Sequence, residues 1–421
     1  MTDRPNVVLI CADQQRMDSL ACYGNKFTVS PNLDRLARSG VRFSRAFTPW
    51  PVCTPARGTM WTGVYPHAHG LIDNVYGVDN AFDSVARIKR TVFDAVRERG
   101  YRTAHFGKWH LGEVRPPFFD VWEESFNSRR GHWIDGKLDG IYRPDRQTEA
   151  MIRFLRAEAG SDRPFLAVQG YYPPHDPYTA PKRFYEPYRG RGVPFAGYYA
   201  AVTALDHDVG LILDTLDQTG LARNTLVVYF ADHGDTFWYR REGEHKFVCH
   251  DDAIMIPMLV AGPGAAAGAV QSAPVGLQDL VATVIDYAGA PADPALHGRS
   301  MRPLIEGKAT AWRGDYYVQN VTHVSAIEQR CLRSDGWKLI AAANGAHELY
   351  NLVEDPEEEL DVFLTPRPDG GFERYKHYPD FAPVIADLAG RMRDTARGLH
   401  DERGVELADA VFAAISGRLT R

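Results

Sequence analysis

Short apolar runs alternate with stretches of helical periodicity along the first three quarters of this chain. Runs such as 5–12, 165–168 and 225–230 have few polar interruptions, as is typical of strands buried on both faces of a sheet. Residues 202–216 instead place apolar side chains at the spacing of an amphipathic helix. The same two criteria predict further strands over 41–47, 103–106 and 256–260, and further helices over 30–40, 55–62, 92–99 and 151–159. The alternation favours an α/β sandwich with a large, mostly parallel central sheet.

The pattern changes after about residue 315. Short strand-like runs follow one another without helices between them, at 316–320, 327–333, 337–342 and 347–350. An acidic turn over 354–361 follows, and the remainder beyond 365 is expected to be helical. We therefore predict a large α/β domain over residues 1–315 and a smaller C-terminal α+β subdomain with an antiparallel sheet over 316–421.

Composition narrows the class of protein. The chain has 421 residues, of which 44% are hydrophobic, so it can bury a large core. Its formal net charge is −6 and it has no long basic block, which argues against a nucleic-acid partner. Five irregularly spaced cysteines do not form a disulfide framework. No signal-peptide pattern precedes the first strand and no apolar run reaches the length of a membrane span, so we expect a cytoplasmic protein without a membrane partner.

Two aspartates follow predicted strands. Asp13 follows the run at 5–12, and Asp232 follows the run at 225–230. Ligand sites of open α/β sheets gather at the carboxyl ends of the strands, where such carboxylates can hold a divalent cation. An aspartate after a strand also commonly caps the next helix. Spacing alone leaves both interpretations open.

The stretch from Pro51 to Gly63 contains the pattern Cys-x-Pro-x-Arg, formed by Cys53, Pro55 and Arg57. On its own, this cysteine is either a small buried hydrophobe or a thiolate near a helix N-terminus and an arginine. Together with a second long stretch, Gly-Tyr-Arg-Thr-Ala-His-Phe-Gly-Lys-Trp-His over 100–110, it resembles the two signatures of the sulfatase family. Residues 337–340 and 348–352 are similar to that family's C-terminal subdomain.

This resemblance implies an alkaline-phosphatase-like fold and the hydrolysis of a sulfate ester to an alcohol and inorganic sulfate. It also implies that Cys53 is oxidised to formylglycine by a formylglycine-generating enzyme, which would be a partner during maturation. The hydrated aldehyde would then attack the sulfur of a small organic sulfate ester. Aryl, sugar and choline-type sulfates all remain open as substrates, and the oligomeric state is not predicted.

The metal ligands implied by the resemblance are Asp13, Gln14, Asp232, His233 and the group derived from Cys53. Calcium is the default ion of the family. Most sulfatases have a second aspartate at the position of Gln14 and often an asparagine at that of His233, so this ligand set is less purely anionic oxygen. Manganese or magnesium therefore remains open as an alternative.

The catalytic roles implied by the resemblance fall on residues from several predicted elements. Arg57 would hold the diol formed from Cys53, and Lys108 and Lys246 would bind the sulfate oxygens. His175 would contact the substrate and protonate the leaving alcohol. His110 would accept a proton from the second hydroxyl of the diol.

Several alternatives remain at this stage. The ligand pattern Asp-Gln and Asp-His also resembles phosphonate monoester hydrolases, and Asn74 falls where those enzymes keep an active-site asparagine that would bind substrate. Residues 107–110 instead match the sulfatase version, so a phosphonate monoester or phosphodiester hydrolase is the second candidate and a non-catalytic binder the third.

His245 or His250 could replace Lys246. The aromatic and basic segment 116–144, with Arg129 and Arg130, could line the substrate cleft or simply pack against the core.

Overall fold

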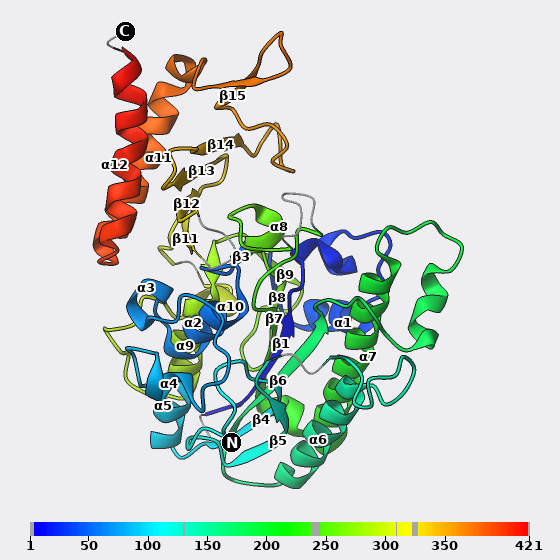
Figure 1. The fold of residues 1–421 in the computed structure, drawn as a ribbon. Helices are drawn as coiled ribbons and strands as arrows, with labels where there is room; N and C mark the ends of the chain where they lie inside the picture. The colour runs from blue at the N-terminus through cyan, green and yellow to red at the C-terminus, as the bar shows by residue number, and fades with distance from the viewer. Residues whose placement is uncertain (1–3, 129–130, 238–244, 309, 322–326, 420–421) are drawn as a thin grey trace.

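A central sheet of eight strands organises the computed structural model, which describes residues 4–128, 131–237, 245–308, 310–321 and 327–419 (Figure 1). The strand order is β5-β4-β6-β1-β7-β8-β2-β9. The bounds are β1 Asn6–Asp13, β2 Val41–Phe43, β4 Arg102–Lys108, β5 Val121–Phe126, β6 Phe165–Pro174, β7 Thr225–Ala231, β8 Met258–Ala261 and β9 Ala269–Gln271.

The sheet is mostly parallel, as predicted. Neighbours from β5 through β4, β6 and β1 to β7 all pair in parallel, whereas β8 runs antiparallel to both β7 and β2. Every residue of β1 is buried, because this strand lies between β6 and β7 and has helices on both faces. Parallel strands all end at the same edge of the sheet, so their last residues are brought together.

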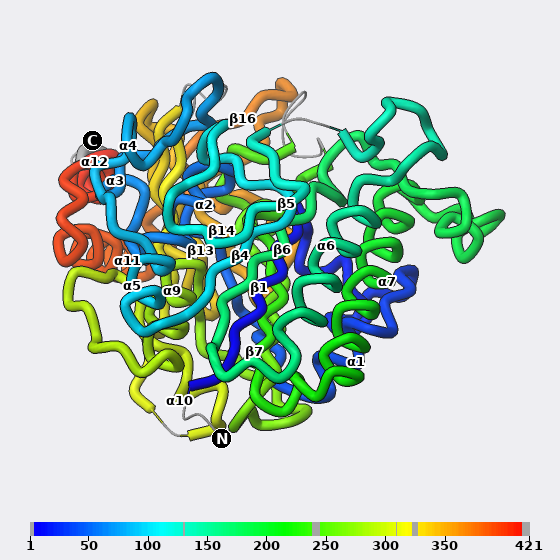
Figure 2. The backbone as a smooth tube through the Cα atoms, turned by 90° about the horizontal axis from the view of Figure 1, so that it is seen from below, coloured from blue at the N-terminus to red at the C-terminus, as the bar shows by residue number. Residues whose placement is uncertain are grey.

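Helices cover both faces of the sheet (Figures 1 and 2). One layer contains α1 (Pro31–Ser39), α6 (Arg143–Glu158) and α7 (Ala196–Thr219). The opposite layer contains α2 (Cys53–Thr62), α5 (Val92–Glu98) and α9 (Leu277–Tyr287). Shorter helical turns are α3 Pro66–His69, α4 Ala81–Ser84, α8 Asp251–Ile254, α10 Arg302–Ile305, η1 Met17–Ser19, η2 Ala21–Tyr23, η3 Lys182–Tyr188 and η4 Leu221–Asn224. Among the described residues, no helix is both long and apolar enough to cross a membrane.

The strand predicted over 41–47 is divided in the structure. Its first part is β2, and its second part, β3 (Ala46–Phe47), pairs with β10 (Val275–Gly276) in a separate two-stranded sheet. The apolar pattern is continuous through this segment, so it could not reveal that the chain changes partners. The helix predicted from Pro55 begins two residues earlier, which makes Cys53 its first residue.

The second sheet contains β11 (Tyr316–Asn320), β12 (Gln329–Arg333), β13 (Trp337–Ala342) and β14 (Glu348–Asn351). All three of its pairings are antiparallel, as predicted. The tail was expected to be helical throughout, but it begins with a hairpin of β15 (Leu364–Pro366) and β16 (Phe372–Arg374). Two long helices, α11 (Tyr378–Gly398) and α12 (Glu402–Leu419), then lie side by side at one end of the molecule (Figure 1).

A buried cluster joins the second sheet to the main part of the chain. Phe47 and Ile254 pack with Val318, Ile340 and other residues of the second sheet. In addition, the side-chain amide of Asn320 donates to the carbonyl of Phe247 at 2.6 Å. The second sheet thus supports the segment that follows Lys246. The division into an α/β domain over 1–315 and a smaller subdomain over 316–421 stays a prediction.

A buried ion network lies at the same junction. The ammonium of Lys338 on β13 is fully buried and forms ion pairs with Asp251, at 2.5 Å, and with Glu358. Arg333 also pairs with Asp251, at 3.1 Å. Removal of one member of such a network leaves an uncompensated buried charge, which is far more destabilising than the loss of an exposed pair.

We expect Lys338→Ala to lower the free energy of unfolding by about 3–5 kcal/mol, because it removes a fully buried cation that pairs with both Glu358 and Asp251. Urea denaturation measures this change. The control is Arg90→Ala, which breaks the exposed pair of Arg90 and Glu98 and should change stability by less than about 1 kcal/mol. Equal effects of the two substitutions would contradict the argument.

Candidate active site

The carboxyl ends of four neighbouring strands meet the N-terminus of α2. Asp13 is the last residue of β1, Lys108 is the last of β4, and His175 directly follows β6. Asp232 directly follows β7, and Cys53 opens α2. All of these side chains are at most 7% exposed. The predicted site residues are therefore gathered in one buried cluster.

Arg57 links this cluster to three elements. It lies one turn after Cys53 on α2 and is 1% exposed. Its guanidinium binds the carboxylate of Asp13 at 2.9 Å and that of Asp232 at 3.0 Å, and it donates to the carbonyl of Lys108 at 2.8 Å. The planar fork of an arginine suits such simultaneous contacts. A role for Arg57 toward the group made from Cys53 stays a prediction.

Asn74 and His110 form hydrogen bonds with Thr54, the second residue of α2. The Oδ1 of Asn74 accepts from the backbone amide of Thr54 at 3.0 Å, so it satisfies one of the free amides of the first helical turn. The hydroxyl of Thr54 donates to the carbonyl of His110 at 3.0 Å. Asn74 thus lies beside Cys53, but its oxygen is engaged in capping. Its predicted contact with substrate stays a prediction.

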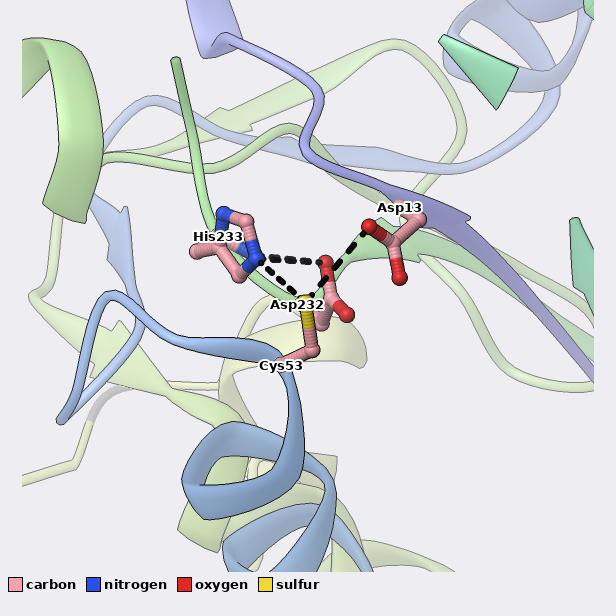
Figure 3. A group of neighbouring side chains, drawn as sticks. All are labelled: Asp13, Cys53, Asp232 and His233. Atoms are coloured by element: carbon pink, nitrogen blue, oxygen red, sulfur yellow. Dashed lines mark hydrogen bonds and ion pairs between the residues drawn. The ribbon is translucent and has the colours of Figure 1, made fainter. Parts of the chain in front are cut away.

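Four side chains could hold a metal ion. The ligand atoms of Asp13, Cys53, Asp232 and His233 all lie within 4.8 Å of one another (Figure 3). The Cys53 sulfur is 3.2 Å from Nε2 of His233 and 3.8 Å from Oδ1 of Asp13. Nδ1 of His233 lies 2.9 Å from the carbonyl of Gly234, which can only accept, so Nδ1 carries the hydrogen and the lone pair of Nε2 faces the cluster.

Gln14 completes this set of donors. Its Oε1 accepts from the ammonium of Lys246 at 2.7 Å, so the amide oxygen faces the cluster. Its Nε2 donates to Asp235 at 2.7 Å. Asp235 is not among the site residues predicted from the sequence; the available signal was its position three residues after Asp232.

Electrostatics show that the cluster suits a cation. Burial and the nearby charge of Asp13 raise the pKa of Asp232 to about 6, so a positive charge placed beside this carboxylate would favour its ionised form. Burial also acts to raise the pKa of Asp13, but Lys108, His175 and Arg57 outweigh it and lower that pKa. Two carboxylates, an amide oxygen and an oriented imidazole are donors suited to a divalent cation.

Two buried lysines lie near Cys53. Lys108 pairs with Asp13 at 2.5 Å, and its ammonium lies 4.6 Å from the ring centroid of Tyr172. Lys246 lies 3.3 Å from the Cys53 sulfur and 3.2 Å from Nε2 of His175. Burial lowers the pKa of both lysines, but the negative groups around them have the larger effect and raise it. Both lysines therefore carry a positive charge.

The two histidines proposed in place of Lys246 lie outside the cluster. Nδ1 of His245 lies 3.3 Å from the hydroxyl of Tyr178, and Nε2 of His250 lies 3.1 Å from that of Tyr350. Lys246 is thus the residue of this segment that reaches Cys53. Sequence proximity could not distinguish the three.

Two imidazoles of the cluster have opposite pKa shifts. Burial and the charge of Lys246 act to lower the pKa of His175, but interactions with Asp176, Cys53 and Asp13 outweigh them and raise it. Nδ1 of His175 lies 2.9 Å from the carboxylate of Asp176. Burial and Lys108 lower the pKa of His110 to about 4. At neutral pH, His110 is therefore neutral, whereas His175 has the stronger tendency to hold a proton.

The aromatic part of segment 116–144 packs against the core. The rings of Phe118, Phe119 and Trp122 surround Trp109 with centroid distances from 5.3 to 6.1 Å. Trp133 belongs to another buried cluster. Packing therefore accounts for these aromatic residues, while Arg129 and Arg130 lie outside the described residues.

Comparison with known proteins gives the family. Residues 5–290 match the sulfatase family model, and residues 238–369 match that of the N-sulphoglucosamine sulphohydrolase C-terminal region. The chain therefore belongs to the sulfatase family and is a sulfuric ester hydrolase. It is 28% identical to an ulvan-active sulfatase of Formosa agariphila over 86% of this chain and 78% of that protein. It is 23% identical to an arylsulfatase of Clostridium perfringens over 92% of this chain and 95% of that protein.

Solved structures confirm the alkaline-phosphatase-like fold. A protein bound to its substrate D-glucosamine-2-N,6-O-disulfate matches with a TM-score of 0.80 at 21% identity, covering 96% of this chain and 99% of that one. The phosphonate monoester hydrolase of Agrobacterium radiobacter matches with a TM-score of 0.75 at 19% identity, covering 94% and 96%. These two likenesses show the shared fold.

We expect a divalent cation to stabilise the chelator-treated protein, because its charge would offset two buried carboxylates. Thermal unfolding should shift upward with added Ca²⁺ or Mn²⁺, and a cation at a hundredfold excess over its Kd contributes about 2.7 kcal/mol. Asp13→Asn should abolish the shift, whereas Glu98→Gln, an exposed acid, should retain it. A shift of equal size in all three proteins would show that the cation binds elsewhere.

Proposed function

We propose that this enzyme hydrolyses the sulfate ester of a small organic alcohol with a formylglycine made from Cys53 and a divalent cation. The observation that carries the proposal is the position of the Cys53 sulfur, which lies within 4 Å of the reactive atoms of Lys246, His233 and Asp13. An oxygen of hydrated formylglycine would stand where this sulfur stands. The aldehyde hydrate would supply the nucleophile and the cation would supply a Lewis acid.

The cation would be held by Asp13, Gln14, Asp232 and His233 together with the group at position 53. Two carboxylates and an amide oxygen suit calcium, the default of the family. The imidazole of His233 also suits manganese, and magnesium remains a third candidate. The identity of the ion is thus open among these three.

The sulfate group would be bound by the two buried lysines. Lys108 and Lys246 are charged and at most 6% exposed, and both lie near Cys53. Fixed positive charges in a site without bulk water stabilise negative charge strongly, because no solvent must reorganise. Asn74 would contribute through its amide nitrogen, since its oxygen already accepts from Thr54.

Proton transfer would be divided between the two histidines. Burial acts to lower the pKa of His175, but interactions with Asp176, Cys53 and Asp13 raise it. Nε2 of His175 lies 3.2 Å from the ammonium of Lys246, and this imidazole would donate a proton to the leaving alcohol. His110 is neutral above about pH 4 and would accept a proton from the group at position 53. Arg57 would keep that group in place through its position on α2.

Maturation would precede folding. Cys53 is 1% exposed in the folded chain and starts a helix whose residues are all buried. A formylglycine-generating enzyme could reach this side chain only while the segment is extended. That enzyme is therefore a proposed transient partner of the nascent chain.

A phosphonate monoester or phosphodiester hydrolase is the second candidate. It is favoured by the glutamine at position 14 and the histidine at position 233, which resemble the ligand pattern of those enzymes. It is also favoured by Asn74, whose Oδ1 accepts from the amide of Thr54, the residue after Cys53. We expect the protein, produced with the maturation enzyme, to show its highest kcat/KM on para-nitrophenyl sulfate rather than on para-nitrophenyl phenylphosphonate or bis(para-nitrophenyl) phosphate. The substrates share one leaving group, so the comparison isolates recognition of the transferred group.

A peptide mass spectrum across Cys53 is the control for this comparison, because it shows whether the aldehyde or its hydrate is present. A preference for either phosphorus ester in converted protein would favour the second candidate. An intact thiol in fully active protein would refute the formylglycine mechanism.

We expect His175→Ala to reduce kcat by about 10²–10⁴-fold on an alkyl sulfate and much less on para-nitrophenyl sulfate. The reason is that a phenolate with a nitro group leaves without protonation, whereas an alkoxide does not. His207→Ala, an exposed imidazole on α7, is the matched control. Equal losses on both substrates would assign His175 to sulfate binding instead.

A further inference from the structure

We propose that Asp235 is a positioning residue that locks the side-chain amide of Gln14 with its oxygen toward the metal site. This inference rests on the proposed function, since it concerns one ligand of the proposed cation. Asp235 itself would not touch the cation. It would act through a hydrogen bond that decides which end of the Gln14 amide faces the cluster.

The contacts of Asp235 define its chemistry. It is fully buried, and its Oδ2 accepts from Nε2 of Gln14 at 2.7 Å and from the hydroxyl of Tyr178 at 2.7 Å. Its Oδ1 accepts from the backbone amide of Phe237 at 2.8 Å. An ionised carboxylate can only accept hydrogen bonds. It therefore selects the donor end of the neighbouring amide and rejects the acceptor end.

Gln14 needs such a partner because its two ends have nearly the same shape and opposite polarity. With Nε2 held by Asp235, Oε1 accepts from the ammonium of Lys246 at 2.7 Å, and the same ammonium lies 3.3 Å from the Cys53 sulfur and 3.4 Å from Nε2 of His233. In the reversed orientation, an NH₂ group would face the ammonium of Lys246 and any cation, which are both positive. A carboxylate at position 14 would need no orienting partner and would be repelled by Asp235.

Gln14 and Asp235 thus form a matched pair of an amide and a carboxylate. Placing the carboxylate at position 14 and the amide at position 235 tests this matching. In Asp235→Asn, the Oδ1 of the asparagine is retained by the amide of Phe237, so its NH₂ faces Gln14 and favours the reversed amide. In Gln14→Glu with Asp235→Asn, a glutamate oxygen accepts from that NH₂ and the other oxygen faces the cluster. The hydroxyl of Tyr178 can rotate to accept from the second hydrogen of the same NH₂.

The experiment measures the Kd of Mn²⁺ by isothermal titration calorimetry on converted, chelator-stripped protein. Outer partners of metal ligands typically contribute 10–100-fold to affinity, so Asp235→Asn should weaken Mn²⁺ binding by about that factor. The double variant should bind at least as tightly as the wild type. Asp18→Asn removes the same charge from an exposed position of the same region and should leave the Kd unchanged.

Each outcome supports or overturns the proposal that Asp235 orients the side-chain amide of Gln14. Unchanged affinity in Asp235→Asn would overturn it, and so would weak binding in both the single and the double variant, because Asp235 would then act only on the local fold. If the single variant fails to fold, a double variant that folds and binds supports the lock, and one that also fails overturns it. Absence of Mn²⁺ binding to the wild type would instead count against the proposed metal site.

Discussion

The ion pairs of Arg57 with Asp13 and Asp232 are the interaction on which the rest of the site depends. They tie α2, which carries Cys53, to the ends of the two central strands β1 and β7. Burying one guanidinium between two carboxylates is favourable only with good geometry and further hydrogen bonds, and the contact of Arg57 with the Lys108 carbonyl supplies one. The position of Cys53 is thus fixed by charge as well as by packing.

The site gathers several charges where water is largely absent. Lys108 and Lys246 stand beside Asp13 and Asp232, and all four are at most 6% exposed. Each charge alone would be expensive to bury, so the arrangement persists because the signs alternate. Burial and the nearby charge of Asp13 raise the pKa of Asp232, so a further cation would favour its ionised form. The same arrangement is what a tetrahedral anion requires, since fixed charges are already placed when it enters.

The smaller sheet contributes to the site from a distance. Asn320 on β11 holds the carbonyl of Phe247, the residue after Lys246. The buried cluster around Phe47 and Val318 fixes β11 against the main part of the chain. The lysine beside Cys53 therefore depends on packing between segments that are remote in sequence.

Local features of the sequence predicted much of this protein. Apolar runs located the strands that end at Asp13 and Asp232, because a strand buried on both faces needs an uninterrupted apolar stretch. Two motifs identified Cys53 and Lys108, since family signatures are contiguous in the chain. The antiparallel sheet after residue 315 was visible in the same way. These predictions succeeded because each depends on neighbouring residues.

Only the tertiary structure decided which groups meet. It selected Lys246 over His245 and His250, divided the strand at 41–47, and placed a hairpin where a helical tail was expected. It paired Asp235 with Gln14, and it gave His110 and His175 opposite pKa shifts. A pKa depends on burial and on charges brought near by folding, and an amide orientation depends on one distant acceptor. Neither quantity is encoded in the local pattern of apolar and polar residues. The sequence by itself therefore predicted most of the residues of the site, whereas the tertiary structure decided their contacts and their pKa shifts.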